Sequence, residues 1–310
     1  MEQNPLVTFF TNSFNRLPLL KNLLRSFEIC NDYPHTEWII TDYGSTDGSI
    51  KFLKNYQQKA AFPVRLIFGD EKEYFRLIKI PNPDRRAKLE AILRKFRNDA
   101  MDAASGDYIF DTGTDHQFIR KGNWVEEIID IFKHRENTVG RDDLSGIIPF
   151  GYFRWRLDKP NNARFPVENE GGIPYYIAKS KAYVDYSVIK KKTRDKIGRF
   201  MEIIDIEPNT PEMKMWIAKD DIIGLEAEYS LRCQKLGLNR VFMKYPVSIS
   251  FSNDMADKLK PDGDNLIIPT RTLEEMKEKF SHLDRPISSD ELCGLETESF
   301  IKRLLNKLEL

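Results

Sequence analysis

Three short polar segments carry residue types that could do chemistry. Residues 11–15 (TNSFN), 42–49 (DYGSTDGS) and 111–116 (DTGTDH) each follow a run rich in apolar residues. The last segment brings two carboxylates and an imidazole together, and Mg²⁺ or Mn²⁺ takes one or two carboxylates plus phosphate oxygens of a substrate. Taken alone, the second segment also fits an ordinary turn in which Ser45 or Asp47 caps a helix, and the third fits a polar turn.

The elements before these segments alternate between apolar runs and amphipathic stretches. Runs rich in β-forming residues at 6–11, 38–41, 64–68 and 108–110 predict strands, and apolar residues at helical spacing predict helices between them. This order predicts an α/β fold with a mostly parallel, Rossmann-like sheet flanked by helices on both faces. Ligands of such sheets bind at the carboxyl ends of the strands, so the polar segments should share one crevice.

Composition and missing motifs exclude several classes of protein. The 310 residues carry 48 basic and 48 acidic side chains, so bulk charge does not favour nucleic acid as a partner. Neither a Walker A loop nor a GxGxxG loop follows the first strand, which disfavours P-loop and dinucleotide-binding proteins. The length favours one large domain with an appended piece.

Cysteine usage and hydropathy bear on the compartment. Cys30, Cys233 and Cys293 fit neither a disulfide framework nor a zinc site, which indicates a reducing, cytoplasmic compartment. No signal peptide and no apolar run of roughly 20 residues is present. A run at 181–199 has seven basic and two acidic residues, an excess of five, which favours a solvated face, with peripheral contact to anionic lipid at the inner membrane face as the alternative.

The same segments resemble a known family, the family 2 glycosyltransferases of the GT-A fold. The family's Thr-x-x-Asn-Arg turn and Asp-Asp-Gly-Ser-Thr-Asp-Gly-Ser segment are similar to residues 10–16 and 38–49. Its Arg-Asn helix and Gly-Asp-Tyr-Ile strand are similar to 97–100 and 104–109, and its Glu-Asp-x-Asp-Leu-x-x-Arg helix to 224–232. The four blocks occur in the family's order and cover roughly residues 5–250.

The resemblance implies a donor site for a nucleotide-sugar, with UDP as the expected nucleotide. Asp42 would hold the base, Thr11 and Phe14 would line the same pocket, and Asn98 would support the nucleotide or sugar. Tyr43 stands where the family usually has a second Asp. It would stack on the base or cover the turn.

The resemblance also implies a divalent cation, Mn²⁺ or Mg²⁺. The family's Asp-x-Asp motif falls on residues 113–115, so Asp115 is the expected metal ligand while Gly113 replaces the first carboxylate. His116 or Asp111 would compensate, ranked below Asp115. The metal-binding His that many members carry near Phe251 is missing, which also weakens the expected metal site.

Glu226 occupies the position of the family's catalytic carboxylate. In an inverting transfer it would remove the proton of an acceptor hydroxyl as that oxygen attacks the anomeric carbon. A glycan or glycolipid acceptor and a role in polysaccharide biosynthesis are implied by the family, and aromatic and arginine residues at 152–176 suit such an acceptor. The alternatives are a non-catalytic GT-A domain that binds nucleotide-sugar or glycan, and a sugar nucleotidyltransferase, which would need a glycine-rich loop after the first strand.

The expected organisation is a GT-A domain over 1–253 and a C-terminal helical extension over 254–310. Within the domain, about 1–120 would form the nucleotide-sugar half and about 121–253 the acceptor half.

Overall fold

The computed structural model describes residues 4–70, 84–137, 140, 142–152, 167–168, 175–178, 187–200, 229–230, 232–233, 235–243 and 247–250. Only the backbone is described at 84–90, 150–152, 167–168 and 176–178. Glu226, most of the aromatic 152–176 stretch and the predicted 254–310 extension lie outside the described residues.

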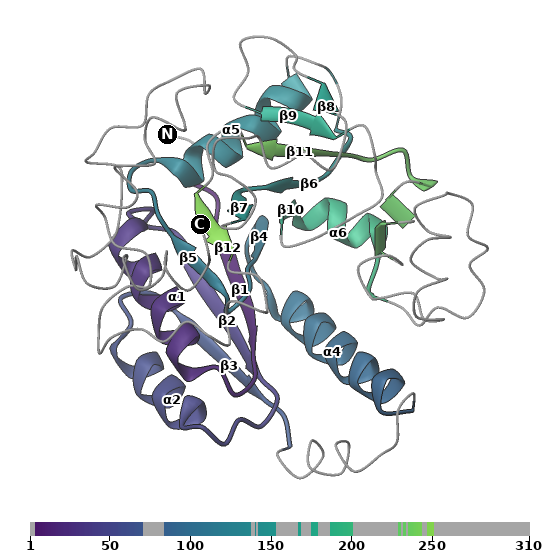
Figure 1. Cartoon of the computed structure of the whole chain (residues 1–310). Coiled ribbons are helices and arrows are strands. Elements are labelled where there is room, and N and C mark those ends of the chain that lie inside the picture. The colour runs from purple at the N-terminus through teal and green to yellow at the C-terminus, as the bar shows by residue number, and fades with distance from the viewer. Residues whose placement is uncertain are drawn as a thin grey trace, which may run out of the picture.

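A nine-stranded sheet organises the protein, in the order β3-β2-β1-β4-β10-β6-β11-β9-β8 (Figure 1). Its strands in chain order are β1 (Val7–Ser13), β2 (Thr36–Asp42), β3 (Val64–Phe68), β4 (Tyr108–Asp111), β6 (Leu144–Ile148), β8 (Val167–Glu168), β9 (Tyr175–Ala178), β10 (Val188–Lys190) and β11 (Asn239–Met243). Strands β3, β2, β1 and β4 are parallel, and β10 is antiparallel to its neighbours β4 and β6. The mostly parallel GT-A-like sheet expected from the sequence is confirmed.

Helices cover both faces of this sheet (Figure 1). Helices α1 (Leu17–Cys30), α2 (Ser49–Lys59) and α5 (Trp124–Asn137) lie on one face, and α4 (Asp84–Ala103) and α6 (Lys191–Ile197) lie on the other.

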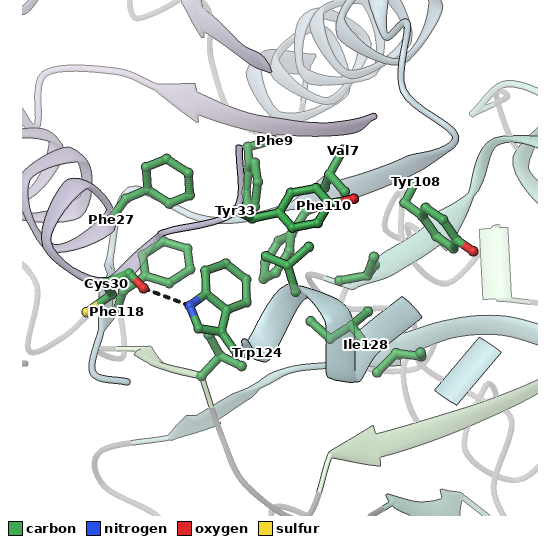
Figure 2. Packing of buried hydrophobic residues seen from close by; sticks show 14 of the residues in the cluster. Val7, Phe9, Phe27, Cys30, Tyr33, Tyr108, Phe110, Phe118, Trp124 and Ile128 are labelled. Atoms are coloured by element: carbon green, nitrogen blue, oxygen red, sulfur yellow. Dashed lines mark hydrogen bonds between the residues drawn. The ribbon is translucent and has the colours of Figure 1, made fainter. Parts of the chain in front are cut away.

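The larger core fills the α1 and α5 side of the sheet. Phe9 of β1 stacks on Phe110 of β4 with ring centroids 4.8 Å apart, and Phe27 of α1 meets Trp38 of β2 at 4.4 Å. Trp124 is fully buried there and donates its indole N–H to the carbonyl of Cys30 at 2.9 Å (Figure 2). Aromatic packing therefore fixes the strands whose carboxyl ends carry the polar segments.

The sequence misses two features of the strand arrangement. The strand-like pattern of the sequence at 241–251 predicts one strand, but the described residues there belong to two: β11 lies in the large sheet, and β12 (Ser248–Ser250) lies in a three-stranded sheet with β5 (His116–Phe118) and β7 (Phe150–Tyr152). The antiparallel β10 is the other, since three residues inside a basic run give no strand periodicity.

The basic run at 181–199 is partly described and is charge-compensated there. Four of its described cations form ion pairs: Lys190 and Lys192 with Glu136 and Asp142, and Arg194 and Arg199 with Asp102. These cations are committed to contacts that hold α6 and β10 against α4 and α5. The described part of the run is therefore ion-paired within the protein, and contact with anionic lipid stays a prediction.

Asp47 ties the first two helices together at their N-termini. Its Oδ2 accepts the backbone N–H of Leu17 at 2.8 Å, and its Oδ1 accepts the N–H of Ser49 at 3.0 Å and the Ser49 hydroxyl at 2.6 Å. Partial burial acts to raise the pKa of Asp47, but the hydrogen bonds from Ser49 and Leu17 outweigh it and lower the pKa. Gly48, and not Asp47 or Ser45, occupies the N-cap position of α2, while the Asp47 carboxylate binds the backbone N–H of the first residue of both α1 and α2.

Replacing Asp47 with Ala should lower the free energy of unfolding by about 1 kcal/mol at neutral pH, the usual loss for a helix cap. Because the folded-state pKa is lowered, this stability is present above the ordinary carboxyl pKa and disappears as the pH falls through the lowered value. Urea unfolding of both proteins at about pH 7 and about pH 3 should therefore show a difference that shrinks in acid. A difference that stays constant across pH would contradict the assignment.

Candidate active site at the carboxyl edge of the sheet

The carboxyl ends of β1, β2 and β4 lie side by side. Ser13 pairs with Asp42 in the β1–β2 register, and Phe10 pairs with Asp111 in the β1–β4 register. The backbone N–H of Thr112 continues that register by donating to the Phe10 carbonyl at 3.0 Å. The three polar segments of the sequence therefore meet at one edge, as the parallel order predicts.

Asp42 is fully buried at this edge and holds the turn that follows β2. Its Oδ1 accepts the backbone N–H groups of Gly44 at 3.0 Å and Ser45 at 2.7 Å, and its Oδ2 accepts the Ser45 hydroxyl at 2.7 Å. Burial raises the pKa of Asp42, and these hydrogen bonds act against that rise. The carboxylate lies where the sequence places it and supports the turn directly, while its contact with a base stays a prediction.

The same turn is locked to the loop after β1. The Ser45 hydroxyl accepts the backbone N–H of Asn15 at 2.8 Å, and Asn15 Oδ1 accepts the N–H of Thr46 at 2.8 Å. Asn15 has a left-handed φ of 48°, which Asn tolerates better than most residues. Asp42, Ser45 and Asn15 thus form one hydrogen-bonded chain, which we call the edge relay, across two loops.

Three hydroxyl groups at this edge are buried without a hydrogen-bond partner in the described part of the chain. They belong to Thr11, Ser13 and Thr112, whose side chains are at most 1% exposed. Thr11 and Ser13, two residues apart, lie on one face of β1, and Thr112 directly follows β4, next to Thr11 in the continued register. Buried polar groups are normally paired, and unpaired ones cluster where a ligand or water completes them.

On the other face of the same edge, Tyr43 lies between two phenylalanines. Its ring centroid is 6.4 Å from Phe14 and 4.7 Å from Phe96 of α4. Its hydroxyl is buried, and burial raises its pKa, with the cation of Arg97 acting in the opposite sense. Phe14 and Tyr43 are both half-buried, so this aromatic pair presents a surface on which a planar group could stack.

Asp111, one of the two substitutes considered for the missing metal ligand, is already paired. Arg97 of α4 contacts its Oδ2 at 2.7 Å, and both side chains are less than 10% exposed. A buried carboxylate with a guanidinium partner is neutralised, and removing it from that pair would leave an uncompensated charge. This pairing makes Asp111 less available to a cation, and Asp115 as the metal ligand stays a prediction.

Asp115 ends the turn after β4, and His116 begins β5. Asp115 is 7% exposed, and Ser250 of β12 donates to its Oδ2 at 3.3 Å. Burial lowers the pKa of His116 to about 3, so its imidazole is neutral, which is the form that binds metals. Among the described residues no group of three or more His, Cys, Asp or Glu side chains could hold a metal ion. One carboxylate beside a neutral imidazole fits a cation that takes its remaining ligands from phosphate and water.

Asn98 is placed differently from Asp42 and Thr11. Its amide donates to the Phe200 carbonyl at 3.0 Å and accepts the Phe200 N–H at 2.9 Å. Both ends of the amide thus hold the chain that follows α6, and contact with a nucleotide stays a prediction. Sequence reasoning assigned no role to Phe200 or Arg97, and only the Arg-Asn pair on α4 pointed to this region.

The strand order, the helices on both faces and the polar edge define a protein of the GT-A-like α/β class. The sequence profile of Glycosyl transferase family 2 matches residues 8–183. This range is more than half of the 310 residues, and the chain belongs to that family. A comparison with curated protein sequences finds no match.

Several solved structures are similar to the chain at low identity. TarS from S. aureus is 10% identical over 90% of this chain and 40% of its own, with a TM-score of 0.49. TarS 1–349 with UDP-GlcNAc is 10% identical over 90% of this chain and 68% of its own, with a TM-score of 0.46. The mannosyltransferase PcManGT from Pyrobaculum calidifontis, with GDP-Man and Mn²⁺, is 12% identical over 81% of this chain and 57% of its own, with a TM-score of 0.47. The chain thus spans less than two thirds of full TarS and of PcManGT.

Among the helices that the structure describes, none combines the length and the apolar character needed to cross a membrane.

Thr11→Val should raise the free energy of unfolding of the ligand-free protein by about 1 kcal/mol, because it removes a buried hydroxyl that has no partner. Thr8 offers a matched control on the same strand, equally buried, because its hydroxyl donates to Glu37 at 2.6 Å and accepts the Gly106 N–H at 2.9 Å. Thr8→Val should therefore destabilise by about 1–3 kcal/mol. Urea unfolding measures both, and equal losses in the two variants would show that the Thr11 hydroxyl is satisfied within the protein.

Proposed function

We propose that this protein is an inverting glycosyltransferase that moves a sugar from a nucleotide-diphosphate-sugar, with UDP as the expected nucleotide, to a hydroxyl of a glycan or glycolipid. Membership of glycosyl transferase family 2 supports the reaction class. A cytoplasmic location, with access to acceptors at the inner membrane face and a role in polysaccharide biosynthesis, belongs to the same proposal.

The observation that carries the proposal is the group of buried, unpartnered hydroxyls of Thr11, Ser13 and Thr112 beside the Asp115 turn. Hydroxyl donors suit the oxygens of a nucleotide diphosphate, and a carboxylate suits a cation that neutralises those oxygens. The half-buried pair Phe14 and Tyr43 lies at the same edge and suits a base. In this proposal the hydroxyls bind the diphosphate and the aromatic pair on the other face of the edge binds the base.

In this proposal Asp115 would hold the cation, which supplies charge neutralisation for the departing diphosphate. Glu226 takes the proton of the acceptor hydroxyl while that oxygen forms its bond to the anomeric carbon and the bond from that carbon to the diphosphate oxygen breaks. The donor-side residues orient the diphosphate opposite the attacking oxygen. This direct displacement inverts the anomeric centre.

The edge relay also disfavours the sugar nucleotidyltransferase alternative. Such an enzyme would need a glycine-rich loop after the first strand. Residues 14–16, which follow β1, contain no glycine, and the backbone N–H of Asn15 is bound to the Ser45 hydroxyl. The non-catalytic alternative would bind the same donor without turnover, and a measurement of nucleotide release distinguishes it from the enzyme.

Purified protein should gain several degrees of melting temperature with one of a panel of UDP- and GDP-sugars in Mn²⁺, since saturating ligand stabilises only the folded state. Asp115→Asn should remove the Mn²⁺-dependent part of that gain. Asp107→Asn, which changes the same residue type at the opposite end of β4 where the side chain is exposed, should retain it.

Slow release of the nucleotide in the absence of an acceptor distinguishes turnover from binding. Glu226→Gln should lower that rate by about 10²–10⁴-fold, the usual contribution of a general base, and leave the melting shift intact. Binding without any release in the unmodified protein would favour the non-catalytic alternative. If no sugar nucleotide shifts the melting temperature, both functions fail.

A further inference from the structure

Residues 197–200, directly after α6, form a junction between parts of the chain that are far apart in sequence. Asn98 of α4 holds the backbone of Phe200 through the two hydrogen bonds described above. Arg232 donates to the carbonyls of Ile197 and Arg199. We call residues 197–200 the junction segment.

The aromatic ring of Phe200 is the centre of this junction. The guanidinium of Arg97 lies 5.3 Å from the ring centroid on one side, and the ring of Tyr229 lies 4.5 Å away. Phe200 and Tyr229 are buried, with 5% and 2% exposure. Cation–π and aromatic contacts of this kind depend on ring position, so they transmit displacement between their partners.

Gly198 explains why the junction segment can accept Arg232. It ends α6 with a φ of +90°, a conformation that favours glycine. A Cβ at this position would lie 3.3 Å from Arg232 Nη1. The turn and the arginine therefore require each other.

The junction segment contacts two parts of the chain that the proposed reaction involves. On one side, Arg97 pairs with Asp111 at the carboxyl edge of β4. On the other side, Tyr229 and Arg232 belong to the helical residues 229–230, 232–233 and 235, which Glu226 closely precedes in the sequence. Contacts thus run from Asp111 through Arg97 and Phe200 to Tyr229.

We propose that Phe200 is a positioning residue that holds the helical residues from Tyr229 onward, three positions after Glu226 in the sequence, relative to the donor edge. Arg97, Asn98 and Arg232 hold Phe200 in place, and Phe200 acts without touching the substrate. This inference rests on the proposed function. A displacement on the order of 1 Å between a catalytic group and its substrate can cost about 10²-fold in rate, so a loosened junction should lower kcat.

The test compares two identical substitutions in the full chain. Phe200→Leu should lower the rate of nucleotide release at saturating donor by about 10–100-fold while the donor dissociation constant stays unchanged. Phe132→Leu makes the same change at a 1% exposed residue of α5 that packs on Tyr108 at the start of β4. It should lower the melting temperature and leave the rate unchanged.

Two further variants keep the test informative if Phe200→Leu does not fold. Arg232→Gln removes the contacts with Ile197 and Arg199 and should lower kcat in the same direction. Tyr229→Phe keeps the ring against Phe200 and should retain kcat. A merely structural role would move the melting temperature of these variants without separating kcat from donor affinity.

An unchanged kcat in Phe200→Leu and Arg232→Gln, an equal loss in Phe132→Leu, or a parallel loss of donor affinity would overturn the positioning role. Failure of the proposed function looks different. In that case the unmodified protein releases no nucleotide, and this result removes both proposals before any variant is compared.

Discussion

A buried carboxylate imposes the arrangement on which the rest of the carboxyl edge depends. Asp42 is removed from water, so its charge is sustained by the N–H groups of Gly44 and Ser45 and by the Ser45 hydroxyl. Because that hydroxyl also accepts the N–H of Asn15, satisfying one charge fixes two loops at once. The ends of β1 and β2 therefore form a rigid unit before any ligand arrives.

This rigidity accounts for the unusual hydroxyls beside it. A buried hydroxyl without a partner costs free energy, and a flexible edge would rearrange to pair it. Thr11 and Ser13 sit on a strand whose end is held by the edge relay and whose middle is packed by Phe9 against Phe110. The protein thus keeps donors oriented for a ligand at a cost in its own stability, a pattern common in functional sites.

The strands and the positions of their ends could be predicted from the sequence, because they depend on local residue pattern and on the parallel strand order. Val64–Phe68 is found as predicted, and the strand ends bring Thr11, Asp42 and Asp111 to one edge. What the sequence could not supply is which partner each polar side chain chooses. Asn98 binds Phe200, a residue 102 positions away, and Asp111 binds Arg97 across two elements. Such contacts depend on how helices pack on the sheet, which periodicity does not encode.

The central claim is that a nucleotide diphosphate binds at the carboxyl edge that the edge relay fixes. A crystal structure of the protein with UDP and Mn²⁺ tests it most directly. The account predicts a diphosphate within hydrogen-bonding distance of the Thr11, Ser13 or Thr112 hydroxyls, with the cation on Asp115 and the Asp42–Ser45–Asn15 contacts unchanged. A nucleotide bound elsewhere, or one that enters only by breaking the edge relay, would contradict it.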